Sequence, residues 1–199
     1  LHFRKTYFPG RMQGDPRVEY EQHERASEII GVPPPIGWEP RVFRSCLIPG
    51  FPYARVSPFG TDPETSNIGT AQKMPVATAA GLLRLLEDAF AQIESLHDAG
   101  LAHGDTELHN FIVCPAPLEL VLIDFEAAVG RETFDDAGWA KRRQLDLDPL
   151  LRELIFISCA LGRQSSRFAE LAWDRMDALF ERPERFRQVI EEQVSPNVR

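Results

Sequence analysis

Three polar side chains that could hold a metal ion and a phosphate group lie close together in the second half of the sequence. Asp105 and Asn110 bracket a polar loop, and Asp124 follows 14 residues after Asn110. Carboxylate and carboxamide oxygens are hard ligands, which suit Mg²⁺ better than zinc. A metal-bound triphosphate and a carboxylate that orients a hydroxyl supply most of what phosphoryl transfer requires. These residues therefore indicate phosphotransfer chemistry.

The elements around this loop can bring the three side chains together. An apolar stripe at three- and four-residue steps predicts a helix over 76–99, before the loop. Two short apolar runs, 111–114 and 118–123, predict a β-hairpin after it. Because a hairpin returns the chain to its starting point, Asp124 should lie beside the loop that precedes the first strand.

The rest of the chain predicts a mixture of short strands and helices. Asp15 and Gly31 are suitable caps for a helix over 16–30. The stretch 51–75 is rich in Pro, Gly, Ser and Thr, which is typical of a loop. The other expected elements are strands over 1–8 and 41–48 and helices over 148–161, 165–180 and 183–193.

Composition narrows the class of protein. The 199-residue chain carries a net charge of −8, which disfavours a general nucleic-acid binder. Its three cysteines are widely spaced, which favours a reducing, cytoplasmic location over a disulfide framework. No apolar run is long enough to span a membrane, so we expect no membrane-spanning segment.

Two motifs resemble those of protein kinases. His103-Gly104-Asp105 followed by Asn110 resembles the catalytic loop, whose Asp and Asn are also five residues apart. Ile123-Asp124-Phe125-Glu126 resembles the DFG element, with Glu in place of Gly. The combination is typical of the atypical branch of the protein-kinase-like superfamily, which includes RIO-like, aminoglycoside, choline and lipopolysaccharide kinases.

The resemblance implies a role for each residue of the motifs. Asp105 would accept or orient the proton of an acceptor hydroxyl, and Asn110 and Asp124 would bind Mg²⁺. His103 would pack against Phe125 and so have a structural role. The segment 145–148 resembles the start of the helix that anchors the catalytic loop.

The resemblance extends upstream to the nucleotide-binding elements. Lys5 would contact the phosphates of ATP as a point charge, and Glu19 from the following helix would hold it in place. Glu21 is a close rival for this pairing, and Glu24 a weaker one. Backbone groups near Leu47 and Ile48, in the segment resembling the hinge between lobes, would meet adenine.

The implied fold class is α+β, a two-lobed protein-kinase-like fold. We expect a truncated N-lobe with the hinge in residues 1–50, made of a short antiparallel sheet and one helix. A mainly helical C-lobe would occupy residues 51–199 and carry the catalytic loop. The chain departs from the family pattern because no glycine-rich loop precedes Lys5 and the segment between Asp124 and Asp148 is short.

The expected activity is transfer of the γ-phosphate of Mg·ATP to an acceptor hydroxyl. The short stretch after residue 162 leaves little material for an enclosing pocket, which favours a serine or threonine of a protein as acceptor. Glu126 in place of glycine favours the alternative, a small-molecule kinase. A second alternative is a pseudokinase that acts as a protein-interaction module.

Overall fold

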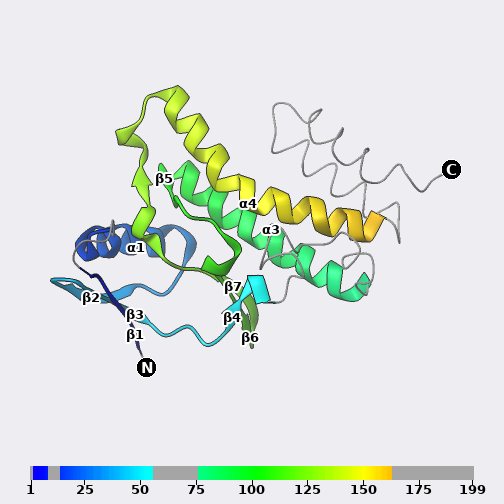
Figure 1. Ribbon diagram of the computed structural model, residues 1–199, viewed down its shortest axis with the longest axis horizontal. Coiled ribbons are helices and arrows are strands. Elements are labelled where there is room, and N and C mark those ends of the chain that lie inside the picture. Colours follow the sequence, from blue (N-terminus) through cyan, green and yellow to red (C-terminus); the bar gives the residue numbers. More distant parts are fainter. Residues whose placement is uncertain (1, 9–13, 56–75, 163–199) are drawn as a thin grey trace. The chain divides into compact units, whose positions relative to one another are not determined.

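The computed structural model describes residues 2–8, 14–55 and 76–162 (Figure 1). By its internal contacts the chain divides into two compact units, Leu1–Tyr53 with Glu87–Leu150 and Ala54–Leu86 with Leu151–Arg199. Every candidate site residue belongs to the first unit. The division into lobes at residue 50 stays a prediction, and the helices expected over 165–180 and 183–193 lie outside the described residues.

The described part of the chain alternates short strands with three α-helices and several single 3-10 turns, which confirms the α+β class. In chain order the elements are β1 (His2–Thr6), α1 (Pro16–Ile30), β2 (Pro35–Glu39), β3 (Val42–Cys46), β4 (Phe51–Pro52), η1 (Tyr53–Arg55), α3 (Val76–Asp98), β5 (Leu101–Ala102), η2 (Leu108–Asn110), β6 (Phe111–Pro115), β7 (Leu118–Leu122), η3 (Phe125–Ala127), β8 (Val129–Gly130), η4 (Arg131–Thr133) and α4 (Asp136–Gly162).

The N-terminal elements form an antiparallel sheet with the strand order β1-β3-β2, and α1 packs against it (Figure 1). Lys5 of β1 pairs with Phe43 of β3, which is buried and lies 5.6 Å, ring to ring, from His23 of α1. The buried residues of α1 recur at positions 19, 23 and 26, which is one face of a helix. A short sheet with one helix is what the sequence predicted for this part.

The bounds of α1 also agree with the sequence, because both caps are local. The backbone N–H of Arg17 donates to Oδ1 of Asp15 at 2.8 Å, so Asp15 is the N-cap. Gly31 ends the helix in the left-handed conformation at φ 70°, which glycine adopts without a steric penalty.

A second sheet, ordered β4-β6-β7, contains the predicted hairpin. Phe111 of β6 pairs with Leu122 of β7, and the backbone N–H of Ile123 donates to the carbonyl of Asn110 at 2.9 Å. The pairing therefore brings the end of the polar loop beside the segment that leads into Asp124. Buried side chains of the hairpin and of α3 and α4 form the core, among them Phe90, Ile93, Leu96, Phe111, Leu122 and Leu150.

Three expectations on secondary structure were wrong. The last described helix begins at Asp136 rather than at residue 148, because Oδ1 of Asp135 accepts from the N–H of Gly138 at 2.7 Å and caps it there. The helix also continues through Pro149, which lies inside it. The strands β2 and β4 were not expected, because each contains a proline, and proline in a short segment usually indicates a loop.

Among the helices formed by described residues, none carries an apolar stretch that would cross a bilayer.

Candidate active site

The centre of the site is an ammonium group surrounded by carboxylates. Nζ of Lys5 lies 2.6 Å from Oδ1 of Asp124, 2.6 Å from Oε2 of Glu126 and 3.4 Å from Oε2 of Glu19. Burial lowers the pKa of Lys5, but the hydrogen bonds to Asp124 and Glu126 outweigh it and raise the pKa above its usual value. Lys5 is therefore charged over the whole physiological pH range.

Glu19 is the partner of Lys5 on α1, as expected, and its carboxylate is almost fully buried. It also accepts a short hydrogen bond from the hydroxyl of Tyr7. The rival Glu21 instead forms an exposed ion pair with Arg17. Burial raises the pKa of Glu19 to about 7, although the charge of Lys5 acts in the opposite direction.

Asp124 is placed by an unusual backbone conformation. It has φ 66° and ψ 69°, in the left-handed region that few residues other than glycine, Asn and Asp adopt. It lies two residues after the end of β7 and is the N-cap of the 3-10 turn η3. The carboxylates of Asp124 and Glu126 both contact Lys5.

The loop with Asp105 and Asn110 lies next to this segment. Nδ2 of Asn110 donates to the carbonyl of Asp105 at 2.9 Å, which closes the loop. Nε2 of His103 lies 3.0 Å from the carbonyl of Ile123, and its ring packs edge-on against Phe125 at 4.9 Å. The contact expected between His103 and Phe125 is thus confirmed. Burial lowers the pKa of His103, which favours the neutral ring.

Asp146 of α4 holds the loop that contains Asp105 in place. Its buried carboxylate accepts from the backbone N–H groups of His103 at 2.8 Å and Gly104 at 2.9 Å, and lies 3.0 Å from Nε2 of His97. Burial alone would raise the pKa of Asp146, but the hydrogen bonds from His97 and Gly104 outweigh it and hold the pKa below its usual value. The segment 145–148 does anchor the loop, though from the middle of a helix.

The residues that sequence reasoning did not assign to the site are Tyr7 and Glu126. Tyr7 lies two residues after Lys5 within the strand expected over 1–8, so the alternation of side chains gave a signal that it faces the same side, although β1 ends at Thr6. Glu126 follows Asp124 by two residues, but only the turn at Asp124 shows that both carboxylates meet Lys5.

The donor set fits a magnesium ion. Carboxylate oxygens of Glu19, Asp124 and Glu126 all lie within 4.8 Å of one another, and oxygen ligands are those that Mg²⁺ prefers. Asn110 donates its Nδ2 to the loop, which leaves its Oδ1 out of that bond, and its role as a metal ligand stays a prediction. The ammonium group of Lys5 and these oxygens together suit a metal-bound phosphate chain.

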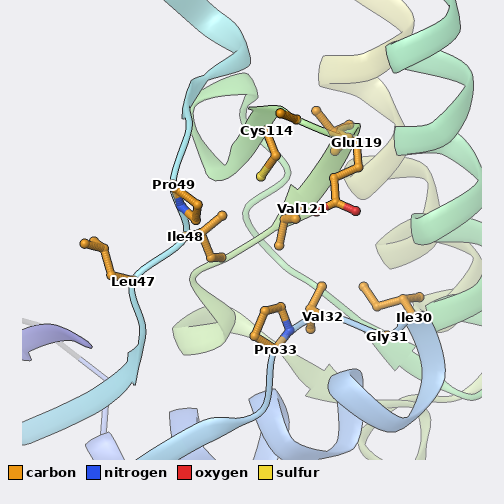
Figure 2. Close-up of a pocket in the computed structure, with 12 residues that line it drawn as sticks. Ile30, Gly31, Val32, Pro33, Leu47, Ile48, Pro49, Cys114, Glu119 and Val121 are labelled. Carbon is orange, nitrogen blue, oxygen red and sulfur yellow. The ribbon is translucent and has the colours of Figure 1, made fainter. Parts of the chain in front are cut away.

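The two predicted adenine contacts lie at a pocket of about 290 Å³. Figure 2 shows the side chain of Ile48 directed into it and that of Leu47 directed away. The remaining walls come from the end of α1, the segment after it and the hairpin β6–β7. None of the residues of the polar centre is among those that line this pocket.

Comparison with known proteins gives the family. The sequence model of the lipopolysaccharide kinase (Kdo/WaaP) family matches residues 71–178, which is more than half of the chain. The chain belongs to this family. The match contains Asp105, Asn110, Asp124 and Asp146, whereas Lys5 and Glu19 precede it. Membership of the protein-kinase-like superfamily is thereby confirmed.

Other comparisons add little to the family assignment. No curated protein matches the sequence. Among solved structures, an ethanolamine kinase of Plasmodium vivax aligns over 89% of this chain and 75% of its own at 12% identity. Its TM-score of 0.35 is too low to define a fold, so the assignment rests on the family model.

Proposed function

We propose that this kinase-like protein transfers the γ-phosphate of ATP to a hydroxyl group of a sugar, as the name of its family suggests. The observation that carries the proposal is the contact of Lys5 with Asp124 next to the loop that holds Asp105. A cation for phosphates, carboxylates for a metal ion and a carboxylate for a hydroxyl are the parts that phosphoryl transfer needs.

In this proposal each residue has one role. Lys5, held by Glu19, contacts the phosphates. Asp124 and Asn110 hold Mg²⁺, which when bound neutralises charge on the phosphate oxygens. Asp105 orients the acceptor hydroxyl and accepts its proton. Asp146 keeps the loop of Asp105 in place through two backbone hydrogen bonds.

The acceptor is where the proposal departs from the sequence-based expectation. The family match does not support the preference for protein serine or threonine and favours the alternative of a small-molecule acceptor. We therefore propose a saccharide hydroxyl such as those of lipopolysaccharide. The adenine contacts near Leu47 and Ile48 and the cytoplasmic location remain predictions.

The test compares acceptors and variants in one assay. Wild-type protein is incubated with Mg·ATP and either deacylated lipopolysaccharide core oligosaccharide or a generic protein acceptor, and phosphate gain is read by intact mass. We expect gain on the oligosaccharide by wild type and by Asp88→Asn, an exposed control, and none by Asp105→Asn. Phosphate on the protein acceptor alone would overturn the sugar assignment. Mg·ATP binding without any transfer would favour the pseudokinase.

A further inference from the structure

Glu126 makes two contacts that its position in the DFG-like motif does not require. Its Oε2 lies 2.6 Å from Nζ of Lys5 on β1. Its Oε1 accepts from the backbone N–H of Gly14, just before α1, at 2.5 Å. A Cβ at Gly14 would lie 2.5 Å from Cγ of Glu126, so the close approach depends on glycine there. One carboxylate thus joins three segments of the chain.

These contacts matter because Asp124 and Glu19, the other partners of Lys5, also interact with other groups. The proposed role of Asp124 is to bind Mg²⁺, and the oxygen that binds the metal is then less available to Lys5. Glu19 lies farther from Lys5, at 3.4 Å, and also accepts from Tyr7. Glu126 therefore has the shortest contact with Lys5 that remains when Asp124 turns to the metal.

The same carboxylate fixes the start of α1. Gly14 immediately precedes Asp15, the N-cap of the helix that carries Glu19. A hydrogen bond from an N–H to a carboxylate is stronger than one between neutral groups. The bond at Gly14 therefore holds the helix, and with it Glu19, at a set distance from the segment 124–126.

We propose that Glu126 is a positioning residue, which clamps Lys5 and Gly14 together and so sets the place of Lys5 against the nucleotide phosphates. This inference rests on the proposed function for its effect on ATP, but the clamp itself does not. Glu126, which stands where the DFG motif has glycine, would thus act by holding Lys5 in position.

A double-mutant cycle tests the dependence on Lys5. The variants are Glu126→Gln, Lys5→Met and their combination, with Glu28→Gln, an exposed glutamate of α1, as the matched control. We expect Glu126→Gln to raise the KM for Mg·ATP roughly tenfold in the wild-type background, as loss of one charged hydrogen bond would. In the Lys5→Met background the same change should have an effect of less than about twofold.

An equal effect of Glu126→Gln in both backgrounds would overturn the proposal and show that Glu126 acts as a metal ligand or directly on substrate. An unchanged KM in the single variant would overturn it as well. The control variant should match wild type in both kcat and KM.

A second measurement does not need activity. Amide hydrogen exchange at Gly14, followed by NMR, should be faster in Glu126→Ala than in wild type or Glu28→Ala, because the acceptor is removed. Unchanged exchange at Gly14 would show that the clamp does not exist. If wild type neither binds nor uses Mg·ATP, the proposed function fails, and the exchange at Gly14 still decides whether Glu126 joins these segments.

Discussion

The ammonium group of Lys5 lies 2.6 Å from a carboxylate oxygen of Asp124, although 119 residues separate the two along the chain. The contact joins the first strand of the N-terminal sheet to the end of the hairpin. Lys5 and a metal ion would compete for Asp124, since the same carboxylate is the one proposed to bind Mg²⁺.

Asp105 and Asp124 should differ in which step they affect. Replacing Asp105 with Asn should lower kcat by roughly 10²- to 10⁴-fold and leave the affinity for Mg·ATP almost unchanged, because its interaction forms mainly in the transition state. Replacing Asp124 with Asn should weaken Mg·ATP binding as well. Isothermal titration with Mg·ATP beside steady-state kinetics separates the two. Equal loss of affinity in both variants would show that Asp105 is not the residue that contacts the acceptor.

Glu19 should make stability depend on pH. Its pKa is about 7 in the folded protein against 4.5 in the unfolded chain, so its contribution is fully present below pH 4.5 and is lost as pH rises through 7. Because glutamine does not ionise, the variant Glu19→Gln should not lose this stability as the pH rises. Relative to wild type, the free energy of unfolding of the variant should improve between pH 5 and pH 8 by on the order of 3 kcal/mol.

Urea unfolding at the two pH values measures this difference. The exposed Glu21→Gln is the matched control on the same helix and should show no such gain. A constant difference between Glu19→Gln and wild type at both values would mean that the carboxylate of Glu19 is ionised at the same pH in the folded and unfolded chain.

Asp146 should be needed for stability, because its buried carboxylate accepts hydrogen bonds from the backbone of the loop that holds Asp105. Asp146→Asn places an amide against the backbone donors of His103 and Gly104, so one of these buried N–H groups loses its acceptor. The expected loss is about 2–4 kcal/mol in the free energy of unfolding, measured with urea. Asp88→Asn, exposed on α3, should change it by less than about 0.5 kcal/mol.

Gly104 should not tolerate a side chain. It has φ 90°, and a Cβ there would lie 2.1 Å from Nη2 of Arg142 and 2.2 Å from the carbonyl oxygen of Ala127. Gly104→Ala should therefore destabilise the protein by more than about 2 kcal/mol and disturb the loop of Asp105. Thermal unfolding can compare it with Gly81→Ala, where a Cβ meets nothing within 4 Å and helix propensity predicts a gain of at most about 1 kcal/mol.

The parts of the fold that were predictable from the sequence depend on local signals. Asp15 and Gly31 cap α1 by bonds within a few residues, so its bounds follow from residue type alone. The hairpin is similar, because two apolar runs and a short turn define it. The convergence of the polar loop on the segment before Asp124 then follows from the topology of any hairpin.

The contacts that were not predicted depend on long-range packing or on one backbone angle. Whether Glu126 meets Lys5 depends on the left-handed turn at Asp124, for which no residue pattern gives a signal. The start of α4 was missed because the helix is capped at Asp135 and continues through Pro149, a residue that usually ends or kinks a helix. The pocket at Ile48 needs three separate segments to be in place before it exists.

The imbalance of charge around Lys5 has a consequence for the order in which ligands arrive. Three carboxylates face a single ammonium group, so this centre repels a free nucleotide, which is itself an anion, and attracts cations. Free ATP should therefore be a poor ligand, and excess chelator should abolish nucleotide binding rather than merely slow turnover. The concentration of free metal ion, more than that of ATP, would then decide how much of the protein is occupied.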